Sequence, residues 1–130
     1  MLMDGDRTLV EKLVEHFPEL REIYEIHVEN NGGLLAHVFF WDVTQEILQC
    51  YLGGPGELQD WRPVLDFLEE EYGKNDALAR EVIVTSFIDN LPYSGQPGED
   101  LSRHLGPRLA EVHRRLRHNS HGSGLSGQLR

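Results

Sequence analysis

The chain has 130 residues and a mass of 14.9 kDa, which gives room for one domain with a single core. Hydrophobic residues make up 39% and charged residues 26% of the chain, and these shares argue against a disordered or fibrous protein. No apolar run approaches the roughly 20 residues of a membrane span, and residues 1–6 lack the basic and apolar regions of a signal peptide. We therefore expect a cytoplasmic protein, and the single cysteine, Cys50, which has no partner for an intramolecular disulfide, agrees with a reducing compartment.

The formal net charge of −10 is unevenly distributed along the chain. Residues 1–100 hold 21 acidic and six basic residues, a net charge of −15, whereas residues 101–130 hold one acidic and six basic residues, a net charge of +5. A body this negative repels nucleic acid and attracts basic proteins. The alternative is that the charge serves only solubility.

The first predicted element is a helix that ends at Pro18. Thr8 and Glu11 have the spacing of a capping box at its start. Its apolar face comprises Leu9, Val10, Leu13, Val14 and Phe17.

Residues 23–40 fit either a helix or a hairpin. Pro18 is well placed to begin a second helix, and Leu20, Ile23, Tyr24 and His27 recur at helical spacing. Alternating apolar residues and the turn-like run Asn30-Asn31-Gly32-Gly33 also fit a β-hairpin. We favour the helix and keep the hairpin as an alternative.

Residues 34–52 are apolar and aromatic, which predicts buried structure with Asp42 as a helix cap, and the loop of residues 53–56 follows. The next helix is predicted to follow Asp60 and to run up to Gly73, with its apolar face at Trp61, Val64, Leu65, Leu68 and Tyr72. Its outer side is acidic close to its C-terminus, where the helix dipole prefers cations. The carboxylates on this side belong to Asp66, Glu69, Glu70 and Glu71. Their unfavourable position is either tolerated or serves a role other than stabilising the helix.

Residues 76–91 predict a helix capped by Asp76, and its nearly complete apolar circumference indicates a central, buried position. After a loop at residues 94–98, a helix is predicted from Pro107 to about Arg117. The predicted organisation is one helical domain, residues 1–118, and a flexible Ser/Gly-rich tail, residues 119–130. The predicted fold is all-α, a compact bundle of five or six helices, with an α+β fold containing an N-terminal β-hairpin as the alternative.

The predicted partner-binding residues are Asp66, Glu69, Glu70, Glu71, Trp41 and Trp61. Their carboxylates offer acceptors to the Arg or Lys side chains of a basic protein. Tryptophan is common at the anchors of protein interfaces, although Trp61 fits a core position equally well. A solvated acidic ridge without a partner is the alternative interpretation.

Two common motifs for catalysis and phosphate binding are missing from the sequence: it has no G-x-S-x-G elbow and no Walker pattern. The alternative function is a small enzyme or ligand-binding domain with a pocket near His37 and Asp42. Cys50 could complete a nucleophile arrangement with these two residues, but a thiol in an apolar run is usually inert. The histidines at 113, 118 and 121 lack zinc-ligand spacing, so we expect no metal and no cofactor.

Several short motifs follow one another along the chain: Phe17-Pro18-Glu19-Leu20, Leu34-Leu35, His37-Val38-Phe39-Phe40, Asp42-Val43-Thr44, Phe67-Leu68-Glu69, Ser86-Phe87-Ile88-Asp89-Asn90-Leu91 and Leu105-Gly106-Pro107. In this pattern the chain resembles, over residues 8–117, a family of small uncharacterised bacterial proteins known mainly from actinobacteria and related soil bacteria. Ala36 and Trp41 stand where we would expect a proline and a glycine. The resemblance implies a small, acidic, mainly helical domain, similar in size and charge to immunity proteins that neutralise polymorphic toxins, and it brings no catalytic residues.

These observations favour a protein-binding module of the immunity or antitoxin type, which neutralises a basic toxin through an acidic face. We expect no membrane partner and no nucleic acid partner for the acidic body. A further possibility concerns Arg114, Arg115 and Arg117, which could contact nucleic acid or the acidic body of a second copy in a homodimer.

Overall fold

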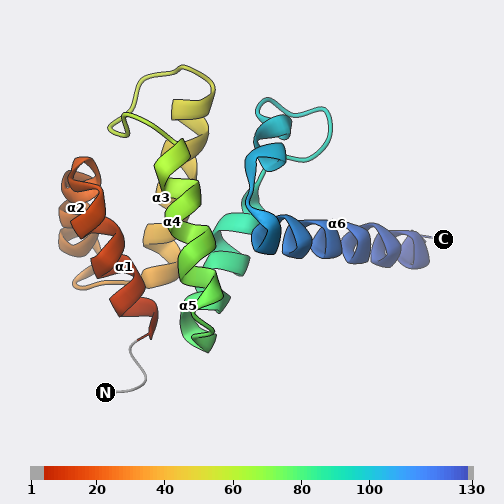
Figure 1. The fold of residues 1–130 in the computed structure, drawn as a ribbon, viewed down its shortest axis with the longest axis horizontal. Coiled ribbons are helices and arrows are strands. Elements are labelled where there is room, and N and C mark those ends of the chain that lie inside the picture. The colour runs from red at the N-terminus through yellow and green to blue at the C-terminus, as the bar shows by residue number, and fades with distance from the viewer. Residues whose placement is uncertain (1–4, 129–130) are drawn as a thin grey trace.

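The computed structural model describes residues 5–128, with side chains described up to His118, and this range contains no strand. The α-helices are α1 (Gly5–His16), α2 (Arg21–Asn31), α3 (Ala36–Tyr51), α4 (Arg62–Gly73), α5 (Ala77–Val82) and α6 (Pro107–Gln128). The shorter helical turns are η1 (Pro18–Leu20), η2 (Ile83–Phe87), η3 (Ile88–Asn90) and η4 (Glu99–His104). The all-α prediction is confirmed, and Figure 1 shows α6 extending away from the bundle formed by the other helices.

Residues 23–40 belong to α2, α3 and the loop between them, so the β-hairpin alternative is wrong. Helix α2 ends where Gly32 takes a left-handed conformation with φ 71°, and the amides of Gly32 and Gly33 donate to the Val28 carbonyl. The rings of Tyr24 and His27 pack against Phe39 of α3. Tyr24 and His27 are three residues apart and therefore reach Phe39 from one side of a helix. These contacts favour the helix over the hairpin that the alternation of apolar residues suggested.

Two predicted helix starts lie inside longer helices. Helix α1 begins at Gly5, so Thr8 and Glu11 lie within it and the predicted capping box is wrong. Helix α3 begins at Ala36, so Asp42 lies inside that helix and does not cap it. By contrast, Asp76 caps α5 as predicted, because its carboxylate accepts a hydrogen bond from the Ala79 amide at 3.0 Å.

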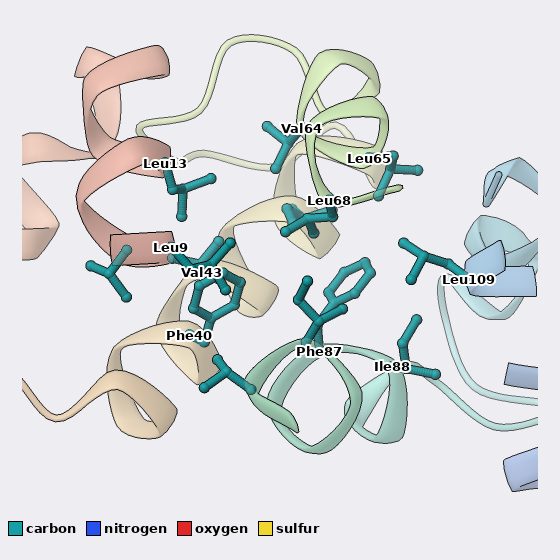
Figure 2. Packing of buried hydrophobic residues seen from close by; sticks show 14 of the residues in the cluster. Leu9, Leu13, Phe40, Val43, Val64, Leu65, Leu68, Phe87, Ile88 and Leu109 are labelled. Atoms are coloured by element: carbon teal, nitrogen blue, oxygen red, sulfur yellow. The ribbon is translucent and has the colours of Figure 1, made fainter. Parts of the chain in front are cut away.

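The predicted central helix is confirmed as the run of α5, η2 and η3, in which η2 is a π-helical turn. Phe87 of this run is fully buried, and Figure 2 shows its ring among side chains that come from α1, α3, α4 and α6. The Ser86 carbonyl, at the end of this π-helical turn, accepts hydrogen bonds from the buried Thr44 hydroxyl at 2.9 Å and from Asn90 Nδ2 at 3.0 Å. The central helix is therefore joined to α3 by a buried polar contact as well as by apolar packing.

Helix α6 begins at Pro107 as predicted, but it continues to Gln128 instead of ending near Arg117. Whether residues 119–130 form a flexible tail in solution stays a prediction, and residues 129–130 lie outside the described range. None of the helices in the described part of the chain combines the length and the apolar character that a bilayer crossing requires.

Candidate functional site

Three of the four predicted acidic residues, Asp66, Glu70 and Glu71, lie in one groove between α1 and α4. The groove has a volume of about 490 Å³ and is lined by Lys12, His16, Phe17, Pro63, Asp66, Phe67, Glu70, Glu71 and Lys74. Because a helix turns once in about 3.6 residues, the α4 residues of this set share one side of the helix. We call this feature the acidic groove.

Glu71 forms part of the wall of the acidic groove and is buried, with 7% of its surface exposed. Its two carboxylate oxygens accept hydrogen bonds from Lys12 Nζ at 3.0 Å and Lys74 Nζ at 2.8 Å. Burial alone would raise the pKa of the Glu71 carboxyl, but the hydrogen bonds and charges of the two lysines outweigh it and lower that pKa below its ordinary value. The Glu71 carboxylate therefore ties α1 to the end of α4.

Asp66 and Glu70 are exposed on the same side of α4. Neither carboxylate forms an ion pair with the described residues, because Glu71 engages both lysines of the groove. The floor beside them is aromatic: the rings of Phe17 and Phe67 meet edge to face with centroids 5.8 Å apart. The groove thus presents two free carboxylates next to an apolar surface.

Glu69 lies outside the acidic groove and contacts the start of α6. Its carboxylate accepts hydrogen bonds from the backbone amides of Arg108 at 2.9 Å and Leu109 at 3.1 Å. These amides have no partner within their own helix, so Glu69 caps α6 from α4 and also meets the positive end of its dipole. Gly106 permits this approach, because a Cβ atom there would lie 2.5 Å from Cδ of Glu69.

A second acidic surface covers the outer side of α2, which the sequence analysis did not select. Glu22, Glu25 and Glu29 are exposed, and their spacing of three and four residues places them on one side of the helix around Ile26, which is 49% exposed. None of the three forms an ion pair within the part of the chain that the structure describes. Like charges at this spacing cost about 0.2–0.5 kcal/mol per pair, so α2 tolerates unfavourable charge on this surface.

The two predicted tryptophans lie in different environments. Trp61 is 8% exposed and packs edge to face against Tyr51 and His104, with ring centroids 5.1 and 4.9 Å away. Its side chain is therefore part of the core. Trp41 is 49% exposed on the outer side of α3 and is not part of the acidic groove.

His37 and Asp42 lie on different sides of α3. Nδ1 of His37 lies 3.0 Å from the hydroxyl oxygens of both Ser86 and Thr85, so the imidazole joins the start of α3 to the central helix. Asp42 lies five residues further along α3, which places it about 140° around the helix axis from His37. Neither residue lines the acidic groove or the cavity described below, and a pocket near them stays a prediction.

A cavity of about 600 Å³ separates the segment of residues 92–103 from α6, and the sequence analysis did not predict it. Arg117 lies in its wall, with its guanidinium carbon 3.7 Å from the Tyr93 ring centroid, and donates to the carbonyls of Leu91 and Pro92. Burial and the Arg117 charge lower the pKa of His113 below its ordinary value. Arg117 thus fastens α6 to the segment that directly follows η3, while a role in binding nucleic acid stays a prediction.

Among the described residues, no three His, Cys, Asp or Glu side chains are grouped to hold a metal ion. The side chain of His121 lies outside the described residues. Arg114 and Arg115 are exposed, and both lie close to the Glu111 carboxylate on their own helix.

The chain belongs to a family described as Domain of unknown function (DUF7674), which matches residues 10–120. This range nearly equals the 8–117 range of the resemblance, so membership of an uncharacterised family is confirmed. No curated protein and no solved structure matches the chain.

Proposed function

We propose that this DUF7674 domain is a protein-binding module that holds a basic partner against its acidic surface. One observation carries the proposal: Glu71 engages both Lys12 and Lys74, so Asp66 and Glu70 remain exposed without a cation from the described residues. These two carboxylates are available to the Lys or Arg side chain of another protein.

The aromatic floor of the acidic groove makes such a contact stronger than an ordinary surface ion pair. An exposed ion pair contributes only about 0–1 kcal/mol. An Arg or Lys side chain in the groove would also place its methylene stem against Phe17 and Phe67, whose rings lie beside the carboxylates. The groove therefore suits a long basic side chain better than a small cation.

The charge of the whole body supports the same class of partner. Residues 1–100 carry a net charge of −15, and the exposed carboxylates of α2 add to the field around the acidic groove. Such a field accelerates the association of a basic protein and weakens as salt screens it.

The biological role that we propose is neutralisation of a basic toxin, such as a nuclease, in the bacterial cytoplasm. The small size and the acidic charge, in which the chain is similar to immunity proteins, support this role. In such a complex the domain would cover the basic surface with which the toxin contacts its substrate.

The test is capture of a partner from a lysate of the source organism at about 0.05 and 0.5 M salt, which differ strongly in screening. The informative variant is Asp66→Lys with Glu70→Lys. The matched control is Glu81→Lys with Asp89→Lys, which changes the net charge equally at two other exposed positions. Glu69 and Glu71 stay unchanged, because both bind groups within the fold.

The proposal predicts a basic protein that is captured at low salt, released at high salt, and lost with the groove variant but retained by the control. Equal loss with both variants would show that net charge alone attracts the partner. An acidic partner, or no partner for the wild type, would contradict the proposal.

A further inference from the structure

A second hollow of the surface, separate from the acidic groove, lies between α6 and the segment of residues 92–103. Its volume of about 600 Å³ is within the range of about 300–1,000 Å³ that is typical of small-molecule sites. Figure 1 shows both of its walls on the side of the bundle away from α1 and α2. We call this hollow the α6 cavity, and the proposed binding of a basic protein does not use it.

Most of the charged side chains in the wall of the α6 cavity already have a partner within the fold. The Glu99 carboxylate accepts a hydrogen bond from the Gly95 amide. Asp100 lies beside the Tyr51 hydroxyl, and burial together with this carboxylate raises the pKa of Tyr51. The Arg117 guanidinium donates to two carbonyls of the segment that follows η3. Two carboxylates and one arginine of the wall therefore serve the fold.

Arg103 is the arginine of the wall without such a partner. It is exposed on η4 and forms no ion pair with the residues that the structure describes. Its planar guanidinium presents a fork of N–H donors that matches the two oxygens of a carboxylate. The unpaired charge in this cavity is therefore positive, whereas the unpaired charge in the acidic groove is negative.

The α6 wall contains further polar groups that the fold leaves unused. Nε2 of His113 and Nε of Arg117 are buried and have no hydrogen-bond partner among the described residues, which is rare for buried polar atoms. Burial and the Arg117 charge lower the pKa of His113, so its imidazole is neutral at pH 7 and has one donor and one acceptor. This wall therefore has hydrogen-bonding capacity in addition to the charge of Arg103.

An aromatic surface lies beside these polar groups. Tyr93 is 46% exposed, although the Arg117 guanidinium carbon lies 3.7 Å from the centroid of its ring. Part of this ring is therefore open to a ligand, and Pro92 extends the same wall. Small-molecule sites typically combine such an apolar surface with a few placed polar groups.

We propose that the α6 cavity binds a small organic acid, with its carboxylate on Arg103 and its ring against Tyr93. A carboxylate satisfies the donor fork of an arginine with two parallel hydrogen bonds. A ligand with two negative charges fits less well, because Glu99 and Asp100 also line the cavity and repel the second charge. The ligand class is therefore a monocarboxylic acid with a flat apolar body.

The experiment is an NMR titration of the full chain with three ring-bearing acids, each compared with its own amide. The probes are benzoate, phenylacetate and cinnamate, and the amides keep their shape but lack the charge. At least one acid should bind at least about tenfold more tightly than its amide. The bound acid should shift backbone amide signals of residues 93–103 and of α6. Acetate, which has no ring, should bind more weakly than this acid.

Variants separate the role of the charge from that of the ring. Arg103→Ala should weaken binding of the acid by at least about tenfold and leave binding of the amide unchanged. Tyr93→Ser should weaken both the acid and the amide, because it removes the surface that they share. Arg114→Ala is the matched control: Arg114 is also exposed but lies outside the cavity, so its loss should change the affinity less than about twofold. Circular dichroism checks that the variants are folded.

Four outcomes would overturn the proposal. They are the absence of binding for all three acids, equal affinity of acid and amide, tighter binding of benzylamine than of benzoate, and unchanged binding of the acid by Arg103→Ala. The capture of a basic protein is tested on the acidic groove, which shares no lining residue with the α6 cavity. Either proposal can therefore fail without affecting the other.

Discussion

Four carboxylates within residues 66–71 of α4 have the same chemistry but two different environments. Glu69 and Glu71 accept hydrogen bonds from groups of α6 and α1, respectively. Asp66 and Glu70 are exposed and have no cation partner among the described residues. The acidic residues of α4 therefore form two surfaces. Glu69 and Glu71 stabilise the fold, whereas Asp66 and Glu70 are available to a partner.

The difference explains how α4 keeps Glu69 and Glu71 near its C-terminus against the preference of its own dipole. The unfavourable position relative to that dipole costs about 0.3–1 kcal/mol per exposed charge. Glu69 offsets this cost at the N-terminus of α6, and Glu71 offsets it through Lys12 and Lys74. Asp66 and Glu70 have no comparable compensation inside the described chain.

The largest expected effect is that of Glu69→Ala. The variant leaves the amides of Arg108 and Leu109 without their acceptor and removes a charge from the positive end of α6, so the free energy of unfolding should fall by about 2 kcal/mol. Urea denaturation followed by circular dichroism measures this change. Glu70→Ala is the neighbouring control and should change stability by less than about 0.5 kcal/mol. Equal effects of the two variants would remove the distinction between the two surfaces.

Glu71 should give a smaller and pH-dependent effect, tested with Glu71→Gln. The folded-state pKa of Glu71 lies below its ordinary value, so its contribution is complete above the unfolded pKa of about 4.3 and is lost as pH falls through the folded pKa. At pH 7 the variant should be less stable by about 1 kcal/mol, because one charged hydrogen-bond acceptor is lost. Urea denaturation of both proteins between about pH 7 and 3 should show this difference shrinking towards acid. A difference that is constant with pH would contradict the role of the ionised carboxylate.

Much of the fold could be predicted from local patterns. The spacing of apolar residues gave α1, α4 and the central helix, and the Asp76 cap and the Gly106-Pro107 break marked two boundaries. The start of α1 at Gly5 was missed, because a capping box is a local signal and the helix extends past it to pack against Asp76 of α5. The hairpin remained an alternative because the contacts that decide it, Tyr24 and His27 with Phe39, lie between separate elements.

The candidate site was harder to predict, for the same physical reason. The sequence indicated the acids of α4 but not which groups they meet. Only the packing of α1 beside α4 brings Lys12 to Glu71 and Phe17 to Phe67. The spacing of Glu22, Glu25 and Glu29 was a usable signal for the second acidic surface.

The smallest effect on stability is expected for Asp66→Asn combined with Glu70→Gln, and this variant separates binding from folding. Exposed carboxylates without a partner contribute little to the fold, so the free energy of unfolding should change by less than about 0.5 kcal/mol. Binding should change more, because the same two charges are those offered to a basic side chain. Fluorescence anisotropy with a short Arg-rich peptide at low salt should show affinity for the wild type that falls in the double variant. Glu81→Gln with Asp89→Asn removes equal charge from other exposed positions and should retain most of that affinity. Equal affinities for the two double variants would mean that the peptide senses only the net charge, and the two surfaces of α4 would then differ in structure but not in recognition.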